Sequence, residues 1–174
     1  IPWVNTSPSI VNVDCARIYP ALCFLEGTNI SEGRGTEKPF SVFGAPFINS
    51  DILLEEINSY GFPGVKFEVT EYTPESSGLA YAPKYLNQKC NGIKISITNY
   101  KDFQPFELSI AILLSLKKTT PEFKWTGKNF IDKLAGTHLL RNYIDSKLDI
   151  ADICNEISND VEIFKEKRNK YLLY

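Results

Sequence analysis

The protein has 174 residues, of which 43% are hydrophobic, 13% aromatic and 23% charged. These proportions are typical of a globular domain and differ from those of disordered, collagen-like or coiled-coil chains. Its 19 basic and 21 acidic residues give a formal net charge of −2. Because nucleic acids and anionic lipids are attracted by a positive field, this balance argues against either as a partner.

The hydrophobic runs of the sequence are too short for a transmembrane helix. The longest, residues 108–116, has about half of the roughly 18 apolar residues that a span needs, so we expect a core helix there and no membrane span. The sequence opens with Ile1 and contains no methionine. We therefore expect a mature or trimmed piece of a longer protein, with any export signal upstream of Ile1.

The cysteines and the single histidine lack the spacing of a metal site. The four cysteines are scattered without a C-x-x-C pair, at Cys15, Cys23, Cys90 and Cys154. His138 is the only histidine, so a zinc cluster has too few ligands and we expect no metal. An even number of cysteines allows disulfides in an oxidising compartment, but apolar neighbours favour buried free thiols.

The N-terminal segment reads as a linker that leads into a strand. Residues 1–20 carry three prolines and few periodic apolar positions, so we expect them to run extended, with a helical turn near residues 14–17. Residues 21–25 form a short apolar run that is typical of a buried strand.

The middle of the chain alternates between strands and a helix. We expect a strand over residues 40–48, then a helix of about three turns over residues 49–61 that begins with an Asn-Ser-Asp cap. Apolar and polar residues alternate over residues 65–69 and 93–97, as in strands with one buried face. The connection between these two strands, residues 72–92, is long enough to predict that it borders a functional site.

The C-terminal part is helical. Asp102 is expected to cap a helix that ends near Pro121, and from Asn129 the pattern is helical almost to the end. Gly136 is expected to close one helix and Thr137 to cap the next. In the last helix, apolar residues recur at three- and four-residue steps, at Ile150, Ile153, Ile157, Val161 and Phe164.

Together these elements predict an α+β fold in one domain. We expect a small mixed or antiparallel sheet, partly barrel-like, that is covered by helices and followed by a helical C-terminus. Residues 1–20 are assigned to the linker and residues 21–174 to the domain. The sequence has no internal repeat that would divide it further.

The best candidate for a site is the polar segment EGTNISEGRGT at residues 26–36. Its three glycines allow close approach of the backbone to a ligand, and its arginine can bind a carboxylate through two N–H groups. Its hydroxyl and amide groups are directional hydrogen-bonding partners, so we expect the loop to bind a polar, acidic sugar. The candidate substrate-binding residues are Glu26, Thr28, Asn29, Ser31, Arg34 and Thr36.

Two nucleotide-binding motifs are excluded by spacing. A P-loop has four residues between its glycines and then Lys before Ser or Thr. In this sequence Gly27 and Gly33 enclose five residues, and Arg34 is followed by Gly35. The dinucleotide pattern G-x-G-x-x-G also fails, since Lys38 stands where the third glycine belongs.

Other interpretations of the loop stay open. Glu26 and Arg34 could simply pair with each other in a structural loop, and the residue types alone do not decide this. Glu26 and Glu32 are six positions apart on a loop, which gives no control over the separation that a glycosidase acid and base require. No Ser/His/Asp triad is evident around His138.

Residues 19–36, YPALCFLEGTNISEGRGT, resemble the signature of the NamZ-like exo-β-N-acetylmuramidases, a family long known as a domain of unknown function. The resemblance continues through shorter segments, at residues 39–40, 44–47, 73–74, 90–92, 130–137 and 171–174. It thus spans essentially the whole chain.

This resemblance implies a longer protein, in which a Rossmann-like N-terminal domain precedes a C-terminal domain like this one and the active-site cleft lies between them. The family removes terminal N-acetylmuramic acid from the non-reducing end of peptidoglycan-derived glycans, in cell-wall turnover or salvage. The implied partners are that glycan and the N-terminal domain, and no cofactor is implied. The implied location is secreted or periplasmic, with a lipoprotein as one form.

The resemblance also bears on the site. The proposed catalytic acid of the family lies in the N-terminal domain, so the catalytic residues are unknown here and the isolated chain is expected to be inactive. Glu26, Asn29, Ser31 and Arg34 are expected to face the cleft, with Arg34 as the partner of the lactyl carboxylate of muramic acid. Glu32 stands where a smaller or apolar residue is expected, and its negative charge weakens that role.

Two alternatives come from other classes of protein. The chain could be a non-catalytic carbohydrate-binding or interaction module, which an assay with and without the N-terminal domain would reveal. It could also be a structural domain whose glycine-rich loop only stabilises the joint between domains.

Overall fold

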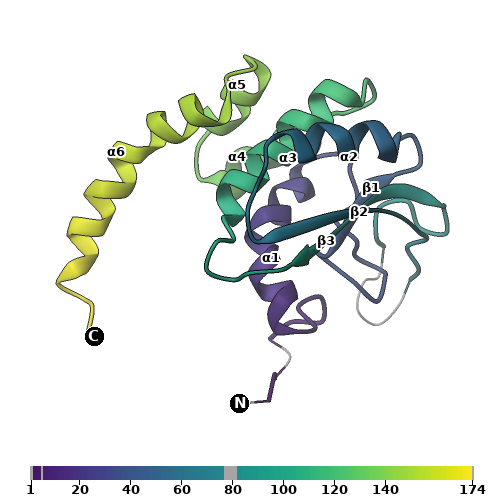
Figure 1. Ribbon diagram of the computed structural model, residues 1–174, viewed down its shortest axis with the longest axis horizontal. Coiled ribbons are helices and arrows are strands. Elements are labelled where there is room, and N and C mark those ends of the chain that lie inside the picture. Colours follow the sequence, from purple (N-terminus) through teal and green to yellow (C-terminus); the bar gives the residue numbers. More distant parts are fainter. Residues whose placement is uncertain (1, 5, 77–81, 174) are drawn as a thin grey trace.

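The structure is a computed structural model that describes residues 2–4, 6–76 and 82–173. Within these residues, helices pack on a small antiparallel sheet, as Figure 1 shows. The elements are α1 (Val13–Leu22), the 3-10 helix η1 (Cys23–Gly27), β1 (Val42–Ala45), α2 (Ser50–Ser59), β2 (Val65–Tyr72), β3 (Cys90–Ile97), α3 (Pro105–Thr119), α4 (Phe130–Ala135), α5 (Leu139–Asp145) and α6 (Ile150–Asn169). The expected α+β class is confirmed.

The sheet has the strand order β1-β3-β2, and both pairings are antiparallel. On its inner face Phe67 lies opposite Ile95 and both are buried. On its outer face Glu68 lies opposite Lys94 and forms an ion pair with it. The alternation of apolar and charged residues therefore placed both of these strands correctly.

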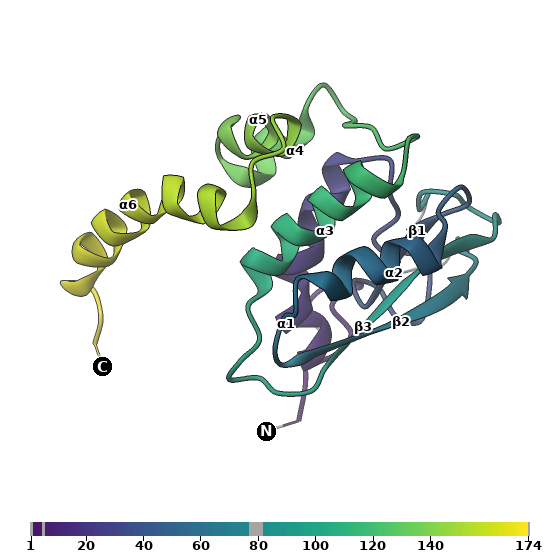
Figure 2. The same cartoon turned by 45° about the horizontal axis from the view of Figure 1, so that its top comes forward.

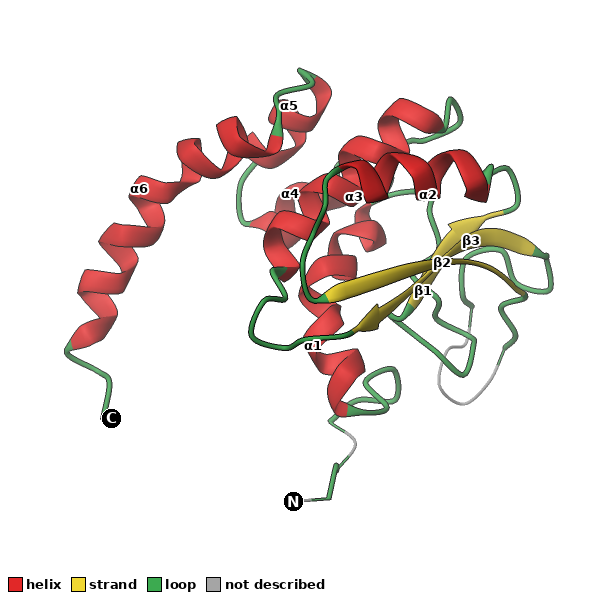
Figure 3. Ribbon diagram, in the orientation of Figure 1, coloured by secondary structure: helices red, strands yellow, loops and turns green. Residues whose placement is uncertain are grey.

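The sheet of the described residues is open, and Figure 3 shows its strands without a closing partner. The barrel-like and mixed alternatives are therefore wrong. Closing a barrel needs more strands than three, each tilted and staggered against the next.

The prediction of a strand at residues 21–25 is also wrong, because these residues end α1 and form η1. Asn12 caps α1 by accepting a hydrogen bond from the backbone N–H of Cys15 at 2.7 Å. The buried residues Cys15, Ile18 and Leu22 follow one another at helical steps. A helix thus occupies residues 13–20 of the segment that was expected to be extended, and is longer than the predicted turn at residues 14–17.

The division of the chain at residue 20 concerns a longer protein and stays a prediction. Within the described residues, however, α1 crosses that boundary and packs against α3 in the core. Residues 13–20 therefore belong to the same folded unit as the residues that follow.

Helix α3 is the central helix of the core, as Figure 2 shows, and its residues Leu108, Ile110 and Leu113 are fully buried. Its N-cap is Gln104, and Pro105 occupies the first turn, so the prediction that Asp102 caps this helix is wrong. Proline has a fixed φ that suits the first helical turn and no N–H to satisfy there. Asp102 instead accepts a hydrogen bond from the side chain of Asn99.

The predicted break at Gly136 is present, but the N-cap of α5 is His138 and not Thr137, and the break between α5 and α6 was not predicted. Gly136 ends α4 in the left-handed conformation, with φ 71°. The side chain of Thr137 accepts a hydrogen bond from the N–H of Leu139 at the start of α5. Helix α6 then runs away from the body of the molecule (Figure 1), and Ile153 is its one fully buried residue among those described.

The four cysteines are free thiols, of which Cys15 and Cys90 are buried. The predicted preference for free thiols over disulfides is confirmed. Among the described residues, we find no helix with the length and apolar character to cross a membrane.

Candidate functional site

The candidate loop follows η1 and is fixed by backbone hydrogen bonds near its start and in its middle. Near its start Thr28 forms a bridge with Trp125, and in its middle Ser31 forms a bridge with Gly44 in β1. The N–H of Ser31 donates to the carbonyl of Gly44 at 2.8 Å, and the N–H of Gly44 donates back at 3.0 Å. The loop is therefore an ordered part of the domain.

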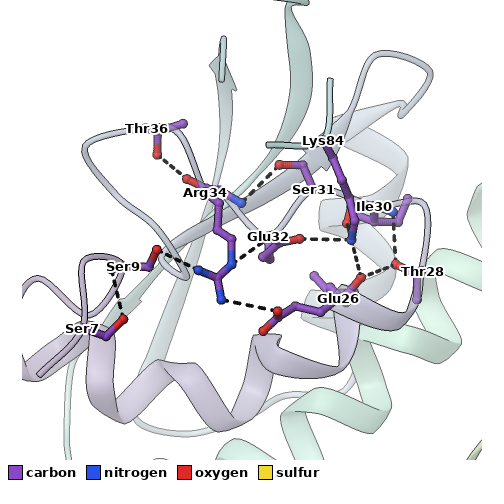
Figure 4. A network of polar contacts seen from close by, with 12 residues as sticks. Ser7, Ser9, Glu26, Thr28, Ile30, Ser31, Glu32, Arg34, Thr36 and Lys84 are labelled. Carbon is purple, nitrogen blue, oxygen red and sulfur yellow. Dashed lines mark hydrogen bonds and ion pairs between the residues drawn. The ribbon is translucent and has the colours of Figure 1, made fainter. Parts of the chain in front are cut away.

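Arg34 lies at the centre of a network of polar contacts, shown in Figure 4. Its guanidinium donates to the hydroxyl of Ser9 at 2.8 Å and to the Glu26 carboxylate at 3.3 Å. Its Nε lies 3.4 Å from Glu32 Oε1, and its guanidinium lies over the ring of Phe40, 4.8 Å from the ring centroid. The pairing of Glu26 with Arg34, left open by the sequence, is present.

Lys84, from the long connection between β2 and β3, completes this network. Its ammonium donates to the carbonyls of Leu25 and Ile30 at 2.7 and 2.9 Å and to Glu32 Oε2 at 3.1 Å. An ammonium has three N–H groups, so these contacts use all of its donors. Sequence reasoning did not single out Lys84, although the length of its loop predicted that the loop borders a site.

The glycines of the loop bring the backbone close to the protein itself. A Cβ at Gly27 would lie 2.7 Å from the backbone nitrogen of Ile131 in α4. Gly33 has φ +79°, and a Cβ there would lie 2.6 Å from the carbonyl oxygen of Val42 in β1. A side chain would clash at both positions, and at Gly33 it would also strain the backbone. These two glycines therefore serve packing of the loop rather than contact with a ligand.

Four of the six candidate binding side chains are engaged with the backbone of the domain. Thr28 donates to the carbonyl of Leu25, and Thr36 donates to that of Gly33. Asn29 donates to the carbonyl of Glu122 and accepts from the N–H of Lys124, both at 2.8 Å. Ser31 is buried and accepts from the N–H of Gly33. Their role in substrate binding stays a prediction.

Glu26 and Arg34 are the two candidates that line a surface hollow. The hollow has a volume of about 360 Å³ and is also lined by Pro83, Lys84 and Phe130. The side chains of Glu26 and Arg34 are 24% and 32% exposed, whereas that of Glu32 is 5% exposed. A ligand in the hollow can therefore reach the first two directly, and we call it the Glu26–Arg34 hollow.

The Glu26–Arg34 hollow is balanced in charge, since two cations face two carboxylates. The negative charge of Glu26 acts on Tyr19, whose pKa is raised by burial and then by this carboxylate. Burial, with a further contribution from Glu26, also raises the pKa of the Cys23 thiol to about 11. Cys23 is therefore a neutral thiol at physiological pH and not a nucleophile.

A larger hollow of about 800 Å³ lies elsewhere, between residues 46–51 and strand β2. One of its polar groups, the Asn49 side chain, is used to cap α2. No group of three His, Cys, Asp or Glu side chains in the described part of the chain could hold a metal ion. We therefore place the candidate site at the Glu26–Arg34 hollow, where charged groups from separate segments converge.

These features define an α+β domain that carries a small open sheet, a helical C-terminus and an ordered loop with a charged surface hollow. Comparison with known families identifies it further. Residues 17–174 match the family described as exo-β-N-acetylmuramidase NamZ, C-terminal, so the chain belongs to this family.

The chain is similar to the peptidoglycan β-N-acetylmuramidase NamZ of Bacillus subtilis, with 35% identity over 175 aligned residues. The alignment covers 100% of this chain and 41% of the Bacillus protein. The chain therefore spans less than half the length of this relative.

Two solved structures have the same fold, and both are DUF1343 family proteins from Bacteroides fragilis. One has a TM-score of 0.84 at 20% identity and covers 100% of this chain and 46% of its own. The other has a TM-score of 0.70 at 29% identity and covers 97% of this chain and 43% of its own. The match over nearly the whole chain agrees with a single folded unit.

Proposed function

We propose that the chain is the C-terminal part of a bacterial exo-β-N-acetylmuramidase that releases N-acetylmuramic acid from the non-reducing end of peptidoglycan fragments. The observation that carries this proposal is the 35% identity with the Bacillus subtilis enzyme, which extends over the whole chain. Because such a substrate lies in the cell wall, we place the protein outside the cytoplasm. It would be secreted or periplasmic, or attached there as a lipoprotein.

In this proposal the Glu26–Arg34 hollow contacts the terminal sugar. Arg34 has five N–H groups, and its contacts with Ser9, Glu26 and Glu32 use one N–H group on each of its three nitrogens. The two remaining N–H groups suit the lactyl carboxylate of muramic acid. The Glu26 carboxylate, part of which faces the hollow, suits sugar hydroxyl groups as an acceptor.

The catalytic acid is assigned to the N-terminal domain of the full-length protein. A glycosidase places two carboxyl groups on either side of the scissile bond. Within this loop, Glu26 and Glu32 both contact the same guanidinium, so they converge on one cation rather than face each other across a substrate. We therefore expect the isolated chain to be inactive.

The test is hydrolysis of a chromogenic N-acetylmuramic acid glycoside by the full-length protein, by the chain alone and by full-length Glu26→Gln. The matched control is full-length Glu55→Gln, which makes the same change at an exposed position on α2. We expect activity in the full-length protein and the control, a higher KM in Glu26→Gln, and none in the chain alone. Full-length protein without activity would contradict the proposal.

A second candidate function is a non-catalytic carbohydrate-binding module. It is favoured by the two carboxylates of the loop, because Glu26 and Glu32 contact one guanidinium and do not face each other as a catalytic pair would, while Glu26 and Arg34 line the hollow. This function predicts that the chain binds muramic acid glycans and that the full-length protein does not hydrolyse them.

A further inference from the structure

Helix α6 carries an apolar stripe that is half-buried at Ile157 and exposed at Val161 and Phe164 in the described structure. The stripe consists of Ile157, Val161 and Phe164, one helical turn apart. Val161 is 45% exposed and Phe164 is 62% exposed. Most helices in proteins owe their stability to packing of an apolar face, so a stripe of this kind indicates a missing contact.

The stripe forms one wall of a groove between α6 and the body of the domain. The opposite wall comes from η1, α3 and α5, through Phe24, Phe106 and Leu140. The groove has a volume of about 330 Å³ and almost all of its lining is apolar. We call it the α6 groove. Exposed apolar surface of this kind is typical of a site that binds another folded part.

We propose that the α6 groove is the docking surface for the domain that precedes this chain in the full-length protein. This inference rests on the two-part protein of the proposed function, but not on its glycosidase activity. The family match is to a C-terminal region, and more than half of the Bacillus protein lies outside the alignment. In the two-part protein of the proposed function, the preceding segment is therefore large enough to be a domain and joins this chain at its N-terminus.

The position of the N-terminus agrees with this assignment. In Figures 1 and 2 the N-terminal end of the chain lies below α1 and the free end of α6 lies at the far left, and both lie toward the lower edge of the view. A domain attached at the N-terminus can therefore reach the stripe without crossing the sheet.

The α6 groove also adjoins the Glu26–Arg34 hollow, because η1 and α4 contribute to both. Phe24 and Ala135 line the groove, while Glu26 and Phe130 line the hollow. A domain seated in the groove would stand beside the hollow and could supply one of its walls. Docking of the preceding domain in the groove would therefore also complete the candidate site.

Hydrogen–deuterium exchange of α6 in the full-length protein tests the proposal with a matched pair of variants. Val161→Glu places a charge in the groove, whereas Ile163→Glu makes the same kind of change at a residue that does not line it. The two side chains are 45% and 42% exposed, so the effect of placing a charge on an exposed part of α6 is matched between the two variants. We expect Val161→Glu to speed exchange of α6 about tenfold or more and Ile163→Glu to leave it unchanged.

Equal effects of the two variants, or no effect of either, would overturn the proposal. So would α6 protection in the wild type that rises with protein concentration together with a doubling of the molecular mass, since a second copy would then fill the groove. Unchanged exchange of α3 shows that a variant is folded. If Val161→Glu also exposes α3, Val161→Ser and Ile163→Ser are compared, with the same expectations.

A glycosidase assay on the same samples separates this proposal from the proposed function. If α6 is protected in a way that depends on Val161 but the protein has no activity, the docking surface is supported and the proposed glycosidase function is contradicted. If the protein is active but its α6 exchanges freely, only the docking-surface proposal is contradicted.

Discussion

Glu32 is the charged side chain whose burial most constrains the candidate site. Its carboxylate is 5% exposed and is contacted by both Arg34 and Lys84. A carboxylate without partners is costly to bury, so its presence in the loop requires cations from elsewhere in the chain. Glu32 therefore joins the loop to the β2–β3 connection, which explains its place in a segment where a smaller residue was expected.

Replacement of Lys84 by methionine should destabilise the domain. It leaves the buried carbonyl of Ile30 without its donor and removes one of the two cations that contact Glu32, so we expect a loss of about 2–3 kcal/mol in the free energy of unfolding. Urea denaturation measures this. The control is Lys89→Met, where an exposed ion pair with Glu71 is removed and the loss should stay below about 0.5 kcal/mol. Equal losses would show that Lys84 is not a structural donor.

Cys23 should react slowly with iodoacetamide in the folded protein. Its pKa is raised to about 11 by burial and by Glu26, so its thiolate is scarce at pH 8. We expect alkylation roughly a hundredfold slower than in the urea-unfolded protein, as followed by peptide mass spectrometry. Similar rates in the two states would place Cys23 in a more polar setting than the structure shows.

At the scale of elements, one ion pair connects α4 to α5. Arg141 donates from two nitrogens to the two carboxylate oxygens of Asp132, at 2.9 and 3.0 Å. Such a fork fixes direction as well as distance. Since α4 also contacts η1, it links the C-terminal helices to the loop that forms the candidate site.

The contribution of this pair should depend on pH. Its hydrogen bond from Arg141 lowers the pKa of Asp132 below the usual value, so as pH falls the unfolded chain takes up the proton first. The stabilisation is then complete near neutral pH and is lost as pH falls from about 4 through the folded pKa. We expect Asp132→Asn to lower the unfolding free energy at pH 7 more than at pH 3. An equal deficit at both values would contradict this assignment.

At the scale of the whole molecule, the chain combines a well-packed body with an uncovered helix. The core lies between α1, α2, α3 and the inner face of the sheet, while most of α6 has no packing partner in the described residues. Such a distribution suits a part of a larger protein better than a solitary domain, because apolar surface left in water tends to find a partner.

The isolated chain should therefore self-associate as its concentration rises. We expect sedimentation velocity to show a growing dimer population for the isolated chain, and little of it for Val161→Glu, because the charge disfavours burial of the groove. Ile163→Glu should associate like the wild type. A chain that stays monomeric at all concentrations would show that the α6 groove is not exposed enough to drive association.

Much of the architecture could be predicted from local sequence. The alternation in β2 and β3, the Asn49 cap of α2 and the closure of α4 at Gly136 all depend on neighbours a few residues away. The short run at residues 21–25 could not be assigned in this way, because a few buried apolar residues suit a strand and a helix equally well. Its helical state follows from packing of α1 against α3, which is remote in sequence.

The sequence by itself determined the family, through the loop at residues 26–36 and the segments that accompany it, and it predicted Glu26 and Arg34 as ligand-binding groups, a role that stays a prediction. Only the tertiary structure decided which candidates are exposed, because burial takes up Thr28 and Ser31 and hydrogen bonds to distant backbone take up Asn29. It alone brought Lys84 to Glu32, since a contact between residues 52 positions apart is set by the folded chain and not by local pattern.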